Sequence, residues 1–468
     1  MQNPQLLLLQ GDMMMSNLKS SVKSTLMIIF IMVIFIFTAV IIPEPDNKAW
    51  LFSVVNSGIS APQSASLPLI LISTQPSSIN HDNKVKGSMT IIEKGELGQG
   101  LLHRLTSASK NSYCVGIKIK EWSSEVNFPK KQFSLEIDKD VSLLDLPADS
   151  GWVLQNPYTD KSLIRNALVY ELSRQMGHYA PRARFVELYL SETQFQLESS
   201  NYRGVYLLTE QLKRSPESVN SKSNNLAMDP SGEYLLEISS EDQLNPDEFS
   251  FKTNQGTTFI IKYPRNDKIN PEEKQWINNY MNDFEKSLWG GQYSDPNVGY
   301  ANYIDINSFI DYMLLNELVR NPDVFIARTF LYKDKGAKLK LGPVWNYDIA
   351  IGNVDTNDNW KTEGWWVANK FWAARLLTDE NFARLYASRW RELRKNCLSD
   401  QNVAALIDGM AAELQGAQTR NFKKWPIMGV HVWPNPDPCP QSYEQEIQSL
   451  KQWLHQRSTW MDAHIEDV

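Results

Sequence analysis

The spacing of hydrophobic residues divides the chain into a strand-like part and a helical part. From about residue 87 to 265, short apolar or alternating runs such as CVGIKIKEW, FVELYL and GVYLLTE predict antiparallel strands, interrupted by one helix around SLIRNALVYELSRQMG. After about residue 270 the spacing changes and predicts mainly helices. A strand-rich first half followed by a helix-rich second half predicts an α+β fold with two lobes.

The helical part carries clear start and stop signals. In NPEEKQWINNYMNDFEKSLWG, Asn270 is a capping residue, Pro271 suits the first turn and Gly290 ends the pattern. A second helix is predicted in DINSFIDYMLLNELVRN, followed by a hairpin in TFLYKDKGAKLKLGPVW with its turn at DKG. Further helices are expected over roughly 377–425 and 441–466.

The most hydrophobic segment is residues 26–42, LMIIFIMVIFIFTAVII, which is apolar except for Thr38 and follows Lys19 and Lys23. Its length and its flanking lysines predict a single-pass transmembrane signal anchor with the rest of the chain extracytoplasmic, in the periplasm or at the cell surface. The run PEPD follows directly, where a cleavable signal peptide carries small residues, so an uncleaved anchor is favoured over a long signal peptide. A buried core helix is the remaining alternative.

These patterns divide the chain into a short tail, an anchor, a linker and one large domain. The linker is rich in Ser, Asn, Pro and Gln and includes one candidate strand, LPLILIST. The predicted segments are a cytoplasmic tail at 1–25, the transmembrane anchor at 26–42, the linker at 43–85, and a domain at 86–466 with a strand-rich lobe at about 86–265 and a helical lobe at about 270–466.

Composition narrows the classes of function. The 468 residues are 42% hydrophobic and 22% charged, which is typical of a globular protein, and the net charge of -7 argues against binding to nucleic acid. Three cysteines without a CxxC pair and six histidines indicate neither a zinc site nor a disulfide framework, so any metal ligands would be oxygens. A Cys397–Cys439 bridge outside the cytoplasm and three buried thiols are both compatible with this count.

The most informative stretch is VRNPDVFIARTFLYKDKGAKLKLGPVWNYDIAIGN, residues 319–353. It places Asn321 and Asp323 at a helix end, and Asn346 and Asp348 directly after the second strand of the predicted hairpin. A hairpin brings its two ends together, so these oxygen-bearing side chains are predicted to face each other around a hard cation, for which magnesium fits best. The alternative is that they are ordinary helix-end and turn residues.

The same stretch resembles the signature of the CotH family of atypical protein kinases. The resemblance is carried by YIDINSFIDYMLLNELVRNPD, the hairpin and GPVWNYDIAIGN, and it continues in SSEVNFPKKQFSLEI, YTDKSLIRNALVYEL, YRGVYLLTEQLKR, RNFKKW and IQSLKQWLHQRSTWMD. It covers about residues 90–465. The resemblance implies an atypical protein-kinase-like fold that binds ATP and magnesium and transfers phosphate to Ser or Thr of a protein substrate.

The resemblance also assigns roles to residues in the 319–353 stretch. Asp323 corresponds to the catalytic-loop carboxylate, and Asp348 with Asn346 to the metal-binding pair. Asn346 stands where the family usually has Asp, and its amide can ligate magnesium but brings no negative charge. This departure keeps open a catalytically weak pseudokinase, or a scaffold for assembly of surface structures, as the alternative function.

Lysines in FPKKQFSLEI are the candidate phosphate-binding cations. Lys130 and Lys131 stand at the entrance to a strand, where neighbouring side chains point to opposite faces, and Lys131 is taken as the one that faces the nucleotide. A solvated basic pair is the alternative. Just before them, Lys120 begins the run KEWSS where the family tends to have RGNSS, so Glu121 replaces a flexible glycine.

Two further features complete the candidate sites. Glu210, at the end of the strand GVYLLTE, resembles the family's strand-end glutamate and is predicted to pair with the phosphate-binding lysine or contact the nucleotide, with an ordinary surface Glu as the alternative. Twelve of the fifteen tryptophans lie at or beyond Trp276, which predicts an aromatic core, while an exposed set would suit carbohydrate binding.

Overall fold

The computed structural model describes most of the chain from residue 64 onward, within a compact unit that spans Ser57–Val468. The described residues are 64–74, 77–93, 95–96, 111–120, 128–192, 199–212, 230–240 and 248–468. The predicted tail at 1–25, the predicted anchor at 26–42 and the residue Glu121 therefore lie outside the described residues.

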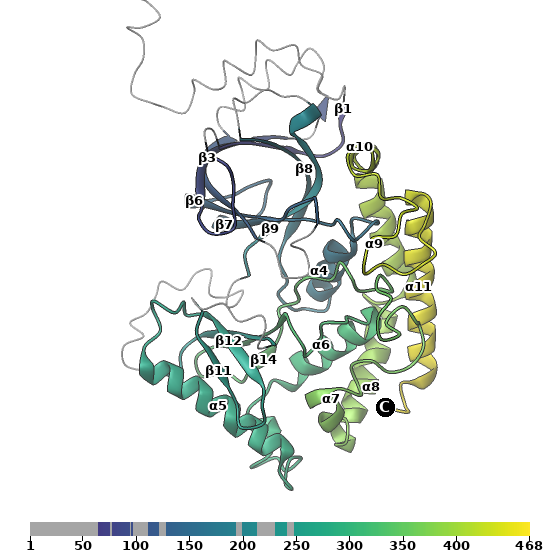
Figure 1. Ribbon diagram of the computed structural model, residues 1–468. Helices are drawn as coiled ribbons and strands as arrows, with labels where there is room; N and C mark the ends of the chain where they lie inside the picture. Colours follow the sequence, from purple (N-terminus) through teal and green to yellow (C-terminus); the bar gives the residue numbers. More distant parts are fainter. Residues whose placement is uncertain are drawn as a thin grey trace, which may run out of the picture. The chain divides into compact units, whose positions relative to one another are not determined.

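Seven strands form a closed barrel in the first half of the chain, the ring of strands in Figure 1. In barrel order they are β2 (Leu69–Ser73), β3 (Val85–Ile92), β5 (Ser112–Ile119), β6 (Phe133–Val141), β7 (Asp149–Gln155), β9 (Tyr202–Glu210) and β8 (Ala183–Ser191). Neighbours are antiparallel except β2 and β8, which pair in parallel and close the ring. Alternate apolar residues, such as Ile70 and Ile72 on β2, pack with Trp152 and Leu188 into a separate core.

A second sheet of five antiparallel strands lies in the middle of the sequence. Its order is β11 (Ser250–Lys252), β12 (Thr258–Tyr263), β10 (Tyr234–Ile238), β13 (Thr329–Lys333) and β14 (Lys340–Leu341). The strands β13 and β14 are the predicted hairpin, and Gly336 in its turn has a φ of +69°, which glycine adopts without strain. A small separate pair joins β1 (Ser64–Ala65) to β4 (Gly95–Glu96).

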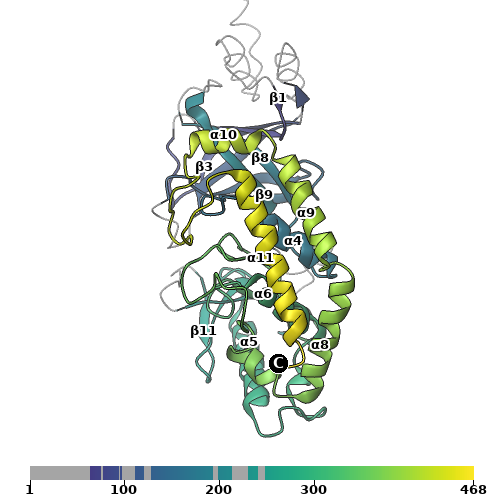
Figure 2. The same ribbon diagram turned by 90° about the vertical axis from the view of Figure 1, so that its right-hand side faces the viewer.

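The helices begin and end largely where the sequence signals place them. In α5 (Pro271–Trp289), Asn270 and Glu273 form a capping box and Gly290 follows the last turn. Figure 2 shows α9 and α11 running side by side, and α10 packs against β9 of the barrel. The remaining helical segments are α4 (Arg165–Gln175), η2 (Ser199–Asn201), η6 (Tyr300–Asn302), α6 (Ile306–Val319), α7 (Phe371–Leu376), α8 (Glu380–Lys395), α9 (Asp400–Glu413), α10 (Ala417–Lys424) and α11 (Tyr443–His464).

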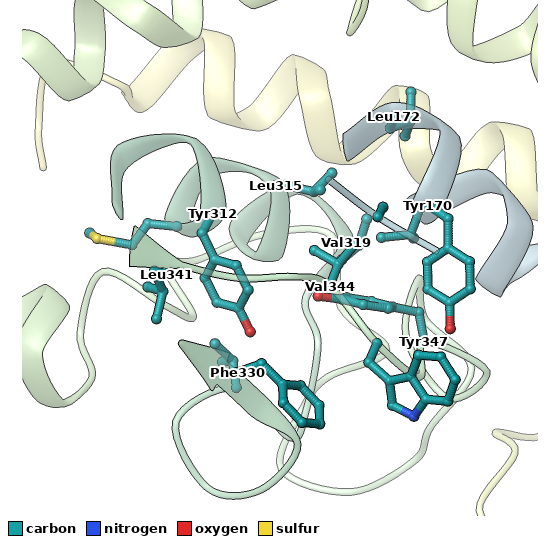
Figure 3. Close-up of a cluster of buried hydrophobic side chains, with 14 of the residues drawn as sticks. Tyr170, Leu172, Tyr312, Leu315, Val319, Phe330, Leu341, Val344 and Tyr347 are labelled. Atoms are coloured by element: carbon teal, nitrogen blue, oxygen red, sulfur yellow. The ribbon is translucent and has the colours of Figure 1, made fainter. Parts of the chain in front are cut away.

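A buried cluster joins the hairpin β13–β14 to the helices α4 and α6. In Figure 3, Tyr170 and Leu172 from α4, Tyr312, Leu315 and Val319 from α6, Phe330 from β13, Leu341 from β14, and the following Val344 and Tyr347 gather in one region. All belong to the larger hydrophobic core. Because Val344 and Tyr347 are anchored there, the loop that contains Asn346 and Asp348 has a fixed position relative to the end of α6.

The prediction of a two-lobed, protein-kinase-like fold is wrong. The structure has a closed barrel and a separate sheet with helices. The strands β10 to β12, predicted as part of the strand-rich lobe, belong to the same sheet as the hairpin of the helical half, and β10 pairs with its strand β13. The physical reason is that hydrophobic periodicity detects strands but does not specify their partners. The closing pair, β2 with β8, joins residues more than a hundred positions apart, and β2 comes from the predicted linker.

The prediction of a single-pass membrane protein with an extracytoplasmic domain is also corrected. Over the part of the chain that the structure describes, none of the helices combines the length and the apolar character that crossing a membrane requires. The prediction rested on the length and hydropathy of residues 26–42 and on the lysines that precede them, and this segment lies outside the described residues.

Cys114, Cys397 and Cys439, which all lie within the described residues, are not joined by a disulfide. Cys439 is buried, Cys397 is half-buried and Cys114 is exposed. The Cys397–Cys439 bridge is therefore not formed, and the alternative of three buried thiols holds only for Cys439.

Candidate functional site

The end of α6 and the start of β13 form a tight turn that carries Asp323 and Arg328. Helix α6 stops at Arg320, which has a left-handed backbone with a φ of 44°. The carbonyl of Asp323 then accepts hydrogen bonds from the backbone N–H groups of Ile326 and Ala327. This turn directs the chain back, so that Arg328 lies against the side chain of Asp323.

Asp323 and Arg328 form an ion pair at the centre of the site. The Nη1 atom of Arg328 donates to Oδ2 of Asp323 over 2.9 Å. The Arg328 side chain is 8% exposed, while the Asp323 side chain is 23% exposed. The guanidinium is therefore held inside the protein, and the carboxylate of Asp323 remains accessible from solvent.

Asn346 connects this pair to Asp348. In the orientation of the Asn346 amide that satisfies both of its polar atoms, the amide oxygen accepts from Arg328 Nη1 over 2.6 Å and the amide nitrogen donates to Asp348 Oδ1 over 2.9 Å. The hydroxyl of Thr159 donates to the other Asp348 oxygen, also over 2.9 Å. We call Asp323, Arg328, Asn346, Asp348 and Thr159 the Arg328 cluster.

Burial sets the electrostatics of Asp348. Removal from water raises the pKa of its carboxyl group above the ordinary value, while the charge of Arg328 and the hydrogen bond from Thr159 act in the opposite direction. The carboxylates of Asp160 and Asp323 add to the upward shift of this pKa. Asp348 lies among apolar residues in WNYDIAIGN, and specific polar partners compensate for its burial.

Buried amides fix the loop on which Asp348 lies. Asn353 donates to the carbonyl of Asp348 over 2.6 Å and to the carbonyl of Thr159 over 3.0 Å. Asn435, from the segment before α11, donates to the same Thr159 carbonyl over 2.9 Å. Three segments distant in sequence thus share one hydrogen-bond network behind the Arg328 cluster.

Arg165 holds the same loop from the other side. It pairs with Asp160 over 2.5 Å and with Glu446 of α11 over 2.7 Å, and its Nε donates to the carbonyl of Ala350 over 3.1 Å. All three charged side chains are buried. Asp160 and Arg165 therefore form a structural pair at the start of α4.

Lys130 is a structural residue of the barrel. Its Nζ donates to the carbonyl of Val205 over 2.6 Å and to the side chain of Asn421 over 3.1 Å, and it lies over the ring of Tyr206. Burial lowers the pKa of this ammonium group well below its ordinary value. Lys130 therefore joins β9 to α10, whereas Lys131, half-buried, stays a predicted phosphate ligand.

Glu210 pairs with an arginine instead of a lysine. Its carboxylate accepts from Arg182 Nε over 3.0 Å, from Arg182 Nη2 over 3.1 Å and from the backbone N–H of Arg182 over 2.9 Å. Val205, which binds Lys130, lies five residues earlier on the same strand, roughly 16 Å away at the usual rise of a strand. The structure thus brings Glu210 together with Arg182, while its proposed contact with nucleotide stays a prediction.

Lys262 and Lys120 belong to a group of charged side chains around Glu237, which the sequence did not predict. Lys262 of β12 binds Glu248 over 2.5 Å and Glu237 of β10 over 3.3 Å. Burial and the charge of Lys262 lower the pKa of Lys120, at the end of β5, to about 8, while Glu237 and Glu248 oppose this shift. The pKa of Glu237 is raised by burial and lowered in turn by Lys262 and Arg328, so these groups lie within electrostatic range of one another.

Arg328 is the most important of the missed residues. It lies five positions after Asp323, between the apolar runs VFIA and TFLY. A charged residue in that setting signals a buried partner, because a lone charge is costly among apolar neighbours. That signal was present in the sequence, but the predicted metal ion already accounted for the negative charge of both carboxylates.

The residues of the cluster do not fit a magnesium ion in this arrangement. Among the residues that the structure describes, no group of three or more His, Cys, Asp and Glu side chains is placed to hold a metal. More directly, the Arg328 guanidinium lies against both Asp323 and Asn346, where the cation was predicted. The positive charge of the guanidinium would repel a divalent ion at this position.

The chain belongs to the CotH family. The family model described as CotH kinase protein matches residues 120–461, which include every member of the Arg328 cluster. The resemblance drawn from the sequence motifs is confirmed by this match. None of the curated proteins compared with the chain matches it.

Proposed function

We propose that the protein transfers the γ-phosphoryl group of ATP to a Ser or Thr hydroxyl of a protein substrate. The observation that carries this proposal is the Arg328 cluster, in which Asp323 and Asp348 come from opposite ends of a hairpin and meet around one positive charge. Membership of the family described as CotH kinase protein supports the reaction type.

In the proposed reaction Asp323 orients the acceptor. The hydroxyl oxygen forms a bond to the γ-phosphorus, the bond from that phosphorus to the bridging oxygen breaks, and ADP leaves with the electron pair. The proton of the hydroxyl passes to the carboxylate of Asp323, whose side chain is accessible from solvent. Arg328 keeps that carboxylate in place and offers positive charge to the transferred group.

A cavity bordered by the turn that follows Asp323 is suited to an acceptor segment. It has a volume of about 320 Å³ and is lined in part by Phe325, Ile326 and Phe371, with Ser239 and Lys252 from the second sheet. Ile326, in the same turn as Asp323, is 55% exposed. A peptide with an apolar residue next to its Ser or Thr would bury this surface.

A second candidate function is nucleotide binding without transfer, as in a pseudokinase that acts as a scaffold. The observation that favours it is the pair Arg328 and Asn346, an arginine and a neutral amide at the position predicted for the metal. The two candidates share ATP binding and differ in chemistry, so a transfer assay separates them.

The test is transfer of label from γ-labelled ATP by the purified full chain, to itself and to a mixture of Ser/Thr-rich proteins. We expect label on Ser or Thr that is lost in Asp323→Asn and retained in Asp267→Asn, an exposed carboxylate in the turn after β12. ATP-dependent thermal stabilisation without any labelling would support the scaffold instead. If neither labelling nor ATP-dependent stabilisation is observed, both phosphoryl transfer and nucleotide binding by a scaffold are excluded.

A further inference from the structure

Arg328 and Asn346 fit each other as a matched set. The Asn346 amide uses its nitrogen to bind Asp348 and its oxygen to bind Arg328. An aspartate at position 346 has no donor for Asp348 and would place a third carboxylate beside two others. The neutral side chain at this position therefore suits a site whose positive charge is already present in the protein.

Arg328 supplies the positive charge of the cluster and leaves one of its two carboxylates without a balancing charge. Asp323 and Asp348 contribute two negative charges, Arg328 contributes one positive charge, and Thr159 and Asn346 are neutral donors and acceptors. A guanidinium stays charged at any accessible pH and binds phosphate oxygens with two parallel hydrogen bonds.

We propose that Arg328 takes the place of a divalent cation, so that this protein binds the phosphate groups of its nucleotide without magnesium. This inference rests on the proposed function for the identity of the ligand. Asp323 and Asn346 both accept hydrogen bonds from the Nη1 atom of Arg328, and these contacts hold the guanidinium charge beside the two acidic positions. The phosphate-binding charge is thereby part of the fold and does not have to be recruited from solution.

Direct measurement of Mn²⁺ binding tests this inference without nucleotide. The full chain is titrated with Mn²⁺, and the free ion is followed by electron paramagnetic resonance. We expect the wild type to bind no ion at this site, and the double variant Arg328→Asn, Asn346→Asp to bind Mn²⁺ more tightly by roughly tenfold or more, the scale on which groups around a metal change its affinity. Circular dichroism establishes that each variant is folded.

Two results would overturn the inference. One is Mn²⁺ binding by the wild type that Asp348→Asn abolishes, which would place an ion beside Arg328. The other is a folded double variant that binds no Mn²⁺, because some group other than the guanidinium would then exclude the metal. If the double variant does not fold, the single variant Asn346→Asp takes its place, and it must bind Mn²⁺ no better than the wild type while Arg328 is present.

A nucleotide arm separates this inference from the proposed function. The thermal midpoint of the wild type is measured with ATP in EDTA and with ATP in Mg²⁺. Equal upward shifts of the thermal midpoint in the two buffers support both the proposed function and the role of Arg328. An upward shift that appears only with Mg²⁺ contradicts the role of Arg328. No shift in either buffer contradicts the proposed function, and the Mn²⁺ titration then still decides what occupies the cluster.

Discussion

The Nη1 atom of Arg328 lies 2.9 Å from the Oδ2 atom of Asp323, and the same nitrogen reaches the amide oxygen of Asn346. Through this contact the end of α6 is joined to the loop that follows β14. The positive charge that the sequence led us to expect from a metal ion is supplied by a side chain five residues along the chain.

Removal of the Asp323 carboxylate is expected to abolish most of the proposed transfer. Asp323→Asn keeps the size of the side chain but cannot accept the hydroxyl proton, so we predict a fall in the transfer rate of roughly 10² to 10⁴-fold. ATP binding should be retained, because the change removes negative charge near the phosphates. The initial rate of label transfer tests the predicted fall in activity. The ATP-dependent shift of the thermal midpoint, measured on the same sample, tests whether ATP binding is retained. Equal rates in Asp323→Asn and wild type would remove Asp323 from the reaction.

Loss of Arg328 is expected to destabilise the protein. Arg328→Met leaves Asp323 and the buried Asp348 without their positive partner, and breaking a buried pair in this way costs roughly 3–5 kcal/mol, less here because Asp323 is partly exposed. Urea denaturation followed by circular dichroism gives the free energy of unfolding. The double variant Arg328→Met, Asp348→Asn should have a higher free energy of unfolding than Arg328→Met alone. If the effects of the two substitutions on the free energy of unfolding simply add, the two side chains are not energetically coupled.

The lowered pKa of Lys120 predicts a specific pH dependence of stability. The folded state releases the Lys120 proton at about 8, against 10.5 as the ordinary value, so the unfolded state binds more protons between these pH values. The free energy of unfolding of the wild type, relative to Lys120→Gln, should therefore rise as pH increases from about 8 to 10.5. If the difference in free energy of unfolding between the wild type and Lys120→Gln does not change over this pH range, Lys120 has its ordinary pKa in the folded protein.

The two lysines of FPKKQFSLEI are expected to behave differently. Lys130→Met removes two hydrogen bonds between β9 and α10, leaves the Val205 carbonyl and Asn421 without this donor, and should lower stability by about 1–3 kcal/mol. Lys131→Met should weaken ATP binding if this side chain meets the phosphates. Urea denaturation and ATP titration of both variants separate the roles. A stable Lys130→Met with weakened ATP binding would reverse this assignment.

Local signals in the sequence predicted individual elements well. Asn270 and Gly290 bound α5 as expected, because capping depends on residues within one turn. The hairpin of β13 and β14 was predicted from its glycine turn, and it does bring positions 323 and 348 to one site. The aromatic core is likewise present, since Trp345, Trp372 and Trp390 are buried, although Trp360 and Trp433 are exposed.

Long-range pairing was not predictable in the same way. The parallel contact between β2 and β8 closes the barrel, and no local pattern in LPLILIST indicates a partner more than a hundred residues away. The same limit applies to the site. The bond from Lys130 to Asn421 and the pair of Glu210 with Arg182 depend on which elements pack together, whereas the sequence offered only residue types and spacing.

The most direct test of the account is the affinity of the full chain for ATP, measured by isothermal titration calorimetry in EDTA, for wild type and Arg328→Gln. Arg328→Gln keeps a hydrogen-bonding side chain but removes the charge. We predict that the wild type binds ATP without a divalent ion and that the variant loses this binding while remaining folded. ATP binding that appears only when Mg²⁺ is added, or that is unchanged in Arg328→Gln, would contradict the account.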